Sequence, residues 1–284
     1  MTSEPTLTYV YAVAVPTPQL GRIVASLRGV DDAPVTLLTP PEDGGPTAPA
    51  FVTSQVLHGD WREEVLRTRF EDLAWLESTA RAHHHVIQTL TDHATVLPLR
   101  MATLYQDDDR ALAALREQQP AFADRLALLA HHAEYGIKVY VRPGAGAPDA
   151  QEAAAPASTS PGKAYLHARK AQHHAREDRY QQATLAAERI AATAARHATH
   201  VVRHPTQTGP LARGEDGEDG ENVLNDSYLV PDDQVEAFRT AVRHASQDLP
   251  GVRIDLTGPW APYSFAMPPP RATGTAHEAP GGRT

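Results

Sequence analysis

Cysteine is absent from this chain of 284 residues. Its absence excludes a disulfide framework, catalysis by a thiol, and any zinc or iron–sulfur site that depends on cysteine ligands. It also fits a protein that works in a reducing compartment. We therefore expect a cytoplasmic location.

Long hydrophobic runs are also missing. No stretch approaches the roughly 20 apolar residues that a membrane-spanning helix needs. The apolar run at residues 7–15 has no basic segment before it and is followed by Pro16 and Pro18, so it does not have the pattern of a signal peptide. We expect a soluble protein with no membrane span and no secretory leader.

Positive charge is scarce in this chain. Lys and Arg number 26 against 35 Asp and Glu, which gives a formal net charge of -9. A surface that binds duplex nucleic acid is normally rich in Lys and Arg. We therefore expect no nucleic-acid partner.

The first third of the chain shows the hydrophobic periodicities of strands and helices. Residues 7–15 are rich in β-formers and almost continuously apolar, as in a central strand, and residues 19–27 have helical spacing. Two further strands are predicted at residues 35–38 and 51–57, and one long helical segment at residues 60–90. The first unit is thus predicted to have the order βαββα.

A second unit is predicted to begin with a strand at residues 96–105, in which Pro98 favours an edge position or a bulge. The elements after it are a helix that breaks at Pro120, a strand at 135–141, an Ala-rich helical segment at 164–201, a strand at 223–230, a helix from about residue 233 and a strand at 252–257. Two βαβ halves around an inserted helical segment form the split-βαβ, or ferredoxin-like, arrangement.

These elements together predict an α+β protein of two domains. The N-terminal α+β domain would cover residues 1–94, and a modified ferredoxin-like domain would cover residues 95–267, with the inserted helical segment at about 163–201. The Pro-, Gly- and Ala-rich or acidic segments contain too little apolar surface to fold and should be cut first by proteases. They are two flexible tracts at 142–162 and 204–220 and a disordered tail at 268–284.

The most information-dense stretch is VRIDLTGPWAPYSF at residues 252–265. Residues 252–257 alternate between apolar and polar, and Gly258 and Pro259 are expected to end that strand. Trp260, Tyr263 and Phe265 then bring large apolar surface into a proline-stiffened segment. We interpret the segment as a buried aromatic plug and favour a structural role for Trp260 and Tyr263, with a partner surface as the alternative.

Histidine is frequent, but its spacing argues against a metal site. His83, His84 and His85 are consecutive on a predicted helix, so their side chains fan over about 200° and cannot converge on one ion. We expect a solvated helix face. The acidic run GEDGEDGEN at 214–222 does not fit a calcium loop, because Gly220 stands where an oxygen ligand is needed. We predict no metal site and no other cofactor.

Catalytic signatures are also missing. The sequence contains no Gly-rich phosphate-binding loop between a strand and a helix, and no nucleophile elbow. We therefore predict a protein that is not an enzyme.

Several sequence blocks resemble, in the same order, those of the GvpL/GvpF family of gas vesicle accessory proteins. The blocks are EDLAWLE at 71–77, VLPLRMATLY at 96–105, YGIKVYV at 135–141, KAYLHARK at 163–170, NDSYLV at 225–230 and LTGPWAPYSF at 256–265. The resemblance implies a two-domain α+β protein that is needed to build gas vesicles and associates with their main shell protein. The Pro/Gly/Ala linker, the acidic tract and the tail depart from the family pattern.

The matching blocks supply candidates for structural or partner-contact residues. Arg100, Lys138 and Arg169 could together bind an anion or an acidic partner, although isolated cations of this kind are more often surface ion pairs. The full set of candidates is Trp75, Arg100, Lys138, Arg169, Trp260, Tyr263 and Phe265.

Three functions from different classes are consistent with the sequence. The resemblance favours a non-enzymatic gas vesicle assembly or minor structural protein, cytoplasmic and vesicle-associated, that binds the hydrophobic shell subunit and other accessory proteins. The alternatives are a ferredoxin-like small-molecule-binding protein or enzyme, because that fold hosts many activities, and a histidine-based metal-binding protein.

Overall fold

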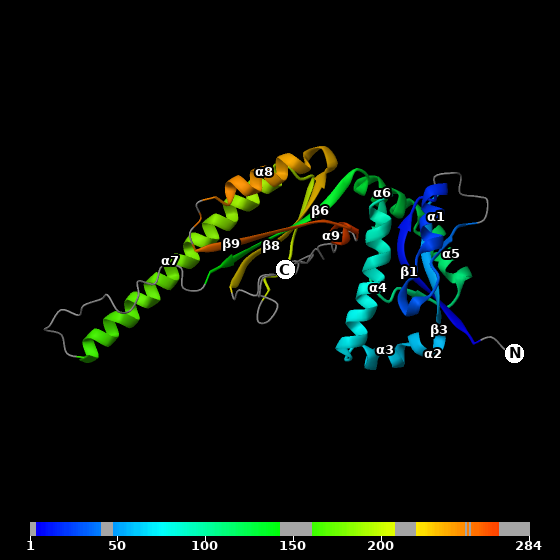
Figure 1. Cartoon of the computed structure of the whole chain (residues 1–284), viewed down its shortest axis with the longest axis horizontal. Coiled ribbons are helices and arrows are strands. Elements are labelled where there is room, and N and C mark those ends of the chain that lie inside the picture. The colour runs from blue at the N-terminus through cyan, green and yellow to red at the C-terminus, as the bar shows by residue number, and fades with distance from the viewer. Residues whose placement is uncertain are drawn as a thin grey trace, which may run out of the picture.

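The computed structural model describes residues 4–40, 48–142, 161–207, 220–247, 249 and 251–266. Two antiparallel sheets, each covered by helices, lie side by side (Figure 1). The predicted α+β class is confirmed.

The N-terminal sheet and the helices that accompany it are built from residues 6–129. In chain order, the elements are β1 (Thr6–Ala14), α1 (Pro18–Ser26), the 3-10 helix η1 (Val30–Asp32), β2 (Thr36–Leu38), β3 (Ala50–Leu57), α2 (His58–Trp61), α3 (Glu63–Arg69), α4 (Leu73–Thr91), β4 (Val96–Pro98), β5 (Leu104–Tyr105), α5 (Asp108–Glu117) and α6 (Gln119–Leu129).

The N-terminal sheet is organised around β1, as its apolar sequence predicts. The strand order is β2-β3-β1-β4, and β5 also pairs with β1. From Thr8 to Ala14 every residue of β1 is buried, because helices cover both faces of the strand. One face packs with Trp61 and Ile87, and the other with Leu115 and Phe122.

The single helix predicted at residues 60–90 is wrong, because the chain forms the three helices α2, α3 and α4 there. Arg62 adopts an extended conformation between the first two helices. Asp72 is also extended, and its side chain accepts hydrogen bonds from the backbone N–H groups of Ala74 and Trp75, so it caps α4. Helical periodicity continues across these breaks, which is why the sequence did not reveal them.

The strand predicted at residues 96–105 is divided and lies in a different sheet from the one expected. β4 and β5 both pair with β1 of the N-terminal sheet, with Leu97 opposite Val13 and Leu104 opposite Tyr9. The prediction that this segment opens the second unit is therefore wrong. The edge position predicted for Pro98 is confirmed, because β4 ends the strand order.

The C-terminal sheet contains β6 (His132–Val141), β7 (His200–Arg203), β8 (Glu221–Pro231) and β9 (Val252–Trp260) in the order β7-β8-β6-β9. Helices α7 (Pro161–Ala195) and α8 (Val235–Ala245) cover one face of this sheet (Figure 1). The C-terminal half also contains the 3-10 helix η3 (Asp232–Gln234) and the short helix α9 (Tyr263–Ala266). Ile190 of α7 and Phe238 of α8 are fully buried against the central strands. This sheet has its own hydrophobic core.

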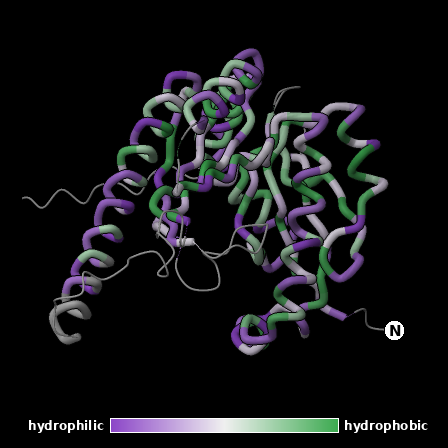
Figure 2. Tube along the Cα trace, turned by 60° about the vertical axis from the view of Figure 1, so that its left-hand side comes forward, coloured by the Kyte–Doolittle hydropathy of each residue, from purple (hydrophilic) through white to green (hydrophobic). Residues whose placement is uncertain are grey.

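Helix α7 is one continuous helix, and its first half extends beyond the sheet (Figure 1). The part that packs on the sheet uses small side chains, including Ala183 and Ala187. Figure 2 shows frequent hydrophilic residues along the extended part. The helical prediction ran too far, because His200–Arg203 forms β7.

The predicted tracts at 142–162 and 204–220 and the tail at 268–284 lie mostly or wholly outside the described residues. Among the helices that the structure describes, none has both the length and the apolar character needed to cross a bilayer.

Candidate partner-contact site

The motif at the C-terminal end of β9 is held close to β6. β9 continues through Gly258 and Pro259 to Trp260, so the expected end of the strand at Gly258 is wrong. Gly258 has a positive φ of 117°, and a Cβ placed on it would lie 2.8 Å from the carbonyl oxygen of Glu134. This position therefore needs glycine for both its conformation and its close contact.

A buried carboxylate fastens the next segment, α9, to the sheet. Ser264 donates its backbone N–H to Glu134 Oε2 at 2.9 Å and its hydroxyl to Oε1 at 2.5 Å. The Ser264 hydroxyl oxygen also lies 3.1 Å from Ser227 Oγ and 3.2 Å from His204 Nε2. Glu134 is buried, so these hydrogen bonds replace the water it loses on folding.

The Ser264, His204 and Glu134 cluster does not have the geometry of a nucleophilic triad. In such a triad the carboxylate orients the histidine, and the histidine accepts the serine proton. Here the carboxylate of Glu134 accepts a hydrogen bond from the Ser264 hydroxyl, so it pairs with the serine and does not orient the histidine. The cluster is a structural tether between β6, β8 and α9.

Phe265 is the buried aromatic residue of the motif. Its side chain is 5% exposed and packs in a cluster that includes Leu97 of β4 and Leu229 of β8. Residues of both sheets meet in this cluster. The predicted plug is therefore confirmed for Phe265.

Trp260 and Tyr263 instead form an exposed surface with a residue of α4. Trp260 is 42% exposed and Tyr263 is 37% exposed. The His84 ring centroid lies 6.2 Å from each of their ring centroids and is stacked on Tyr263. We call the side chains of His84, Trp260 and Tyr263 the aromatic shelf.

The buried plug predicted for Trp260 and Tyr263 is therefore wrong in its main feature, which is burial of both rings. Desolvation by burial raises the pKa of the Tyr263 hydroxyl above its ordinary value. The tether through Ser264 turns Phe265 inward and leaves the preceding rings at the surface. Exposed and rigidly held aromatic rings are typical of protein-binding surfaces.

Trp75 belongs to a separate aromatic group on the N-terminal helices. Its ring centroid lies 5.5 Å from that of Trp61 and 5.9 Å from that of Phe70. The Arg69 guanidinium lies 5.4 Å from the Trp75 ring centroid and also pairs with Asp60. These contacts favour a packing role for Trp75.

The three candidate cations lie on separate elements. Arg100 is exposed in the turn between β4 and β5, Lys138 lies in the middle of β6 opposite Asp255 of β9, and Arg169 is exposed on the extended part of α7. Among the described residues, no hydrogen bond or ion pair joins these side chains. The structure does not bring them together into one anion site.

His83 contradicts the prediction of a solvated histidine face. It is 4% exposed, with Nδ1 2.9 Å from the Tyr9 hydroxyl and Nε2 3.2 Å from the carbonyl oxygen of Leu99. Because a carbonyl can only accept, Nε2 carries the proton and Nδ1 accepts from Tyr9. His84 belongs to the aromatic shelf, and only His85 is exposed to solvent as expected.

We expect His83 to make stability depend on pH. Desolvation by burial lowers its pKa from 6.5 to about 4. Between these values the unfolded chain binds a proton that the folded chain does not, so the free energy of unfolding falls by about 3 kcal/mol as pH drops. Urea denaturation measures the free energy of unfolding at about pH 7 and at about pH 4.5, and this free energy should fall less for His83→Ala than for wild type. An equal fall in both proteins would contradict the lowered pKa of His83. As a control, His85→Ala should show the same fall as wild type.

The other histidines among the described residues do not form a metal centre. No group of three His, Asp or Glu residues among those described is arranged to hold a metal ion. His173 and His174 both approach Glu177 on the surface of α7. The run at 214–222 lies mostly outside the described residues.

The sequence predicted the motif but not the residues that place it. Glu134, Ser227 and His204 come from three segments and match no local pattern, and the sequence does not distinguish His84 from its neighbours His83 and His85. The one local signal for this tether is Ser264, a polar residue between Tyr263 and Phe265.

Comparison with known proteins gives consistent results along the chain. The family model described as "Gas vesicle synthesis protein GvpL/GvpF" matches residues 7–267. Gas vesicle protein L of Streptomyces sp. is 38% identical over 260 residues, covering 92% of this chain and 92% of that protein. Gas vesicle protein F of the same strain is 26% identical over 199 residues, covering 69% of this chain and 80% of that protein. The crystal structure of GvpF from Anabaena sp. superposes with a TM-score of 0.58 at 17% identity, covering 93% of this chain and 97% of that one.

Proposed function

This chain belongs to the GvpL/GvpF family of gas vesicle synthesis proteins, and on that premise we propose that it is a non-enzymatic gas vesicle assembly or minor structural protein. It would bind the hydrophobic shell subunit and other gas vesicle accessory proteins in the cytoplasm, at the growing or finished vesicle. The observation that carries the proposal is the family match over residues 7–267, which spans both sheets.

A binding function is supported by what the motif exposes. The aromatic shelf offers Trp and Tyr rings, which account for much of the binding energy at many protein interfaces. Its residues come from α4 and from the β9–α9 segment, so their spacing depends on how the two sheets are joined. We propose that the aromatic shelf contacts the shell subunit or an accessory protein.

A structural rather than catalytic use of the buried polar residues supports the absence of enzymatic activity. Glu134 accepts both hydrogen bonds from Ser264 and holds α9 against the sheet. This arrangement keeps the aromatic shelf in place, which a rigid binding surface requires.

The fold of the C-terminal half deepens the proposal. We infer a modified ferredoxin-like domain, for which the element order β6-α7-β7-β8-α8-β9 and the strand order β7-β8-β6-β9 are the support. We also propose that the chain divides into two domains, with the boundary near the start of β6, because β4 and β5 pair with β1.

Replacing Trp260 with alanine should weaken partner binding without unfolding the protein. The ring is 42% exposed, so its removal should lower the free energy of unfolding by no more than about 1 kcal/mol. Loss of an aromatic hot spot should reduce capture by immobilised shell subunit or accessory protein at least about tenfold. A pull-down beside a thermal denaturation curve measures both effects.

Phe70→Ala is the matched control, because Phe70 is also 42% exposed and lies outside the aromatic shelf. It should retain binding. A large loss of stability in Trp260→Ala with unchanged capture would overturn the role of the aromatic shelf, whereas failure of wild type to capture either partner would overturn the proposed function itself.

A further inference from the structure

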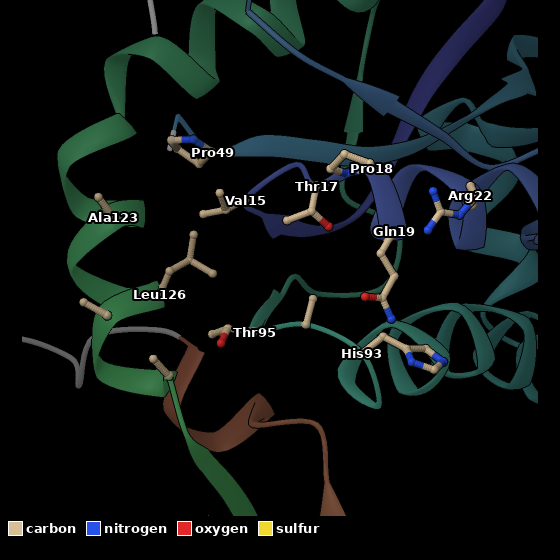
Figure 3. A pocket seen from close by; sticks show the side chains of 13 residues that line it. Val15, Thr17, Pro18, Gln19, Arg22, Pro49, His93, Thr95, Ala123 and Leu126 are labelled. Carbon is tan, nitrogen blue, oxygen red and sulfur yellow. The ribbon is translucent and has the colours of Figure 1, made fainter. Parts of the chain in front are cut away.

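A cavity of about 840 Å³ opens on the N-terminal half of the protein, among the end of β1, the start of α1, the end of α4 and α6 (Figure 3). No residue of the aromatic shelf lines it. Its volume lies within the range of about 300–1,000 Å³ that is typical of sites for small ligands.

One side of the cavity is polar and positively charged. Arg22, Gln19 and His93 lie on this side in Figure 3, and the Arg22 guanidinium points into the cavity. Over the described part of the chain, the side chains of Arg22 and His93 make no hydrogen bond or ion pair with another residue. Asp92, the neighbour of His93, accepts from Gln88 and does not line the cavity.

The lining residues that the structure describes include no Asp or Glu, although the whole chain is acidic. The cavity also lies at the N-terminal end of α1, where the helix dipole adds partial positive charge. Arg22 has no acidic partner among the residues that the structure describes, and an arginine at the edge of a cavity is complementary to a carboxylate, which it binds with two parallel hydrogen bonds.

The opposite side is apolar. Val15, Ala123 and Leu126 lie there in Figure 3, with Ala127 one turn beyond Ala123 on α6. The alanines keep this side shallow enough for a chain to lie against α6. An occupant that fits both sides must therefore combine a carboxylate with apolar groups.

We propose that this cavity is a docking site for a short segment of a partner protein in which acidic and apolar side chains alternate. A carboxylate of the segment pairs with Arg22, and its apolar side chains cover Val15 and the exposed face of α6. The inference goes beyond the proposed function and does not rest on it, because charge complementarity and the cavity itself carry it.

The test uses a short fluorescein-labelled peptide of alternating leucine and glutamate, and a counterpart with glutamine in place of glutamate. Fluorescence anisotropy with the full chain should show saturable binding of the glutamate peptide and at least about tenfold weaker binding of the glutamine peptide. Arg22→Glu should weaken binding of the glutamate peptide by a similar factor, because it reverses the charge that the peptide carboxylate meets.

Two further variants separate this site from general attraction. Arg28→Glu makes the same charge change at an exposed residue outside the cavity and should bind as wild type. Ala127→Trp should block the apolar side, and since Ala127 is exposed the variant should keep the wild-type melting temperature. No saturable binding of the glutamate peptide, equal binding of both peptides, or an equal effect of Arg22→Glu and Arg28→Glu would each overturn the proposal.

Discussion

Truncating Phe265 to alanine should lower the free energy of unfolding by about 3–5 kcal/mol, the cost of removing a buried phenylalanine from a packed core. The ring is 5% exposed and lies among Leu97 of the N-terminal sheet and Leu229 of the C-terminal sheet. Its loss leaves a cavity where the two sheets meet, so both should be loosened. Urea denaturation followed by circular dichroism measures the change.

Phe265→Leu is the control, because it keeps most of the apolar volume of the side chain. It should lower the free energy of unfolding by less than Phe265→Ala does. Trp260→Ala, only five residues earlier, should cost no more than about 1 kcal/mol. The reverse order, with Trp260→Ala the more damaging, would restore the interpretation of the whole motif as a buried plug.

Replacing His83 with alanine should lower the free energy of unfolding by about 2–4 kcal/mol near neutral pH. The substitution empties a buried site and removes a hydrogen-bond partner from both the Tyr9 hydroxyl and the Leu99 carbonyl. It also deletes a ring that packs 5.6 Å from the ring of Tyr11. Chemical denaturation at about pH 7 measures the effect.

His85→Ala is the matched control, two positions further along the same helix and exposed to solvent. It should change the free energy of unfolding by less than about 0.5 kcal/mol. If His83→Ala were equally neutral, the solvated histidine face predicted from the sequence would be right and the buried network wrong.

The sequence itself contains a signal for the burial of His83. His83 lies four residues before Ile87 and seven before Leu90, which is the spacing of one helix face, and all three are buried. Helical periodicity therefore places His83 on the buried face, although it is one of three consecutive histidines.

Other errors had no local remedy. β7 has the sequence HVVR, in which two of the four residues are polar, His200 and Arg203. It follows an Ala-rich helix, and no proline or glycine between them marks the change from helix to strand. It becomes a strand because it pairs with β8, as Val201 does with Tyr228. The same holds for β4 and β5, whose partner β1 begins about 90 residues earlier.

The sequence alone determined the central strands β1 and β6, the edge strand β9, the break of the helix near Pro120 and the special character of the C-terminal motif, because apolar periodicity and proline act within a few residues. Only the tertiary structure decided which aromatic rings of that motif face inward. Glu134 holds Ser264 across a separation of 130 residues, and His84 arrives from a helix of the other sheet. Burial depends on such distant partners, so Phe265 became core while Trp260 and Tyr263 became surface.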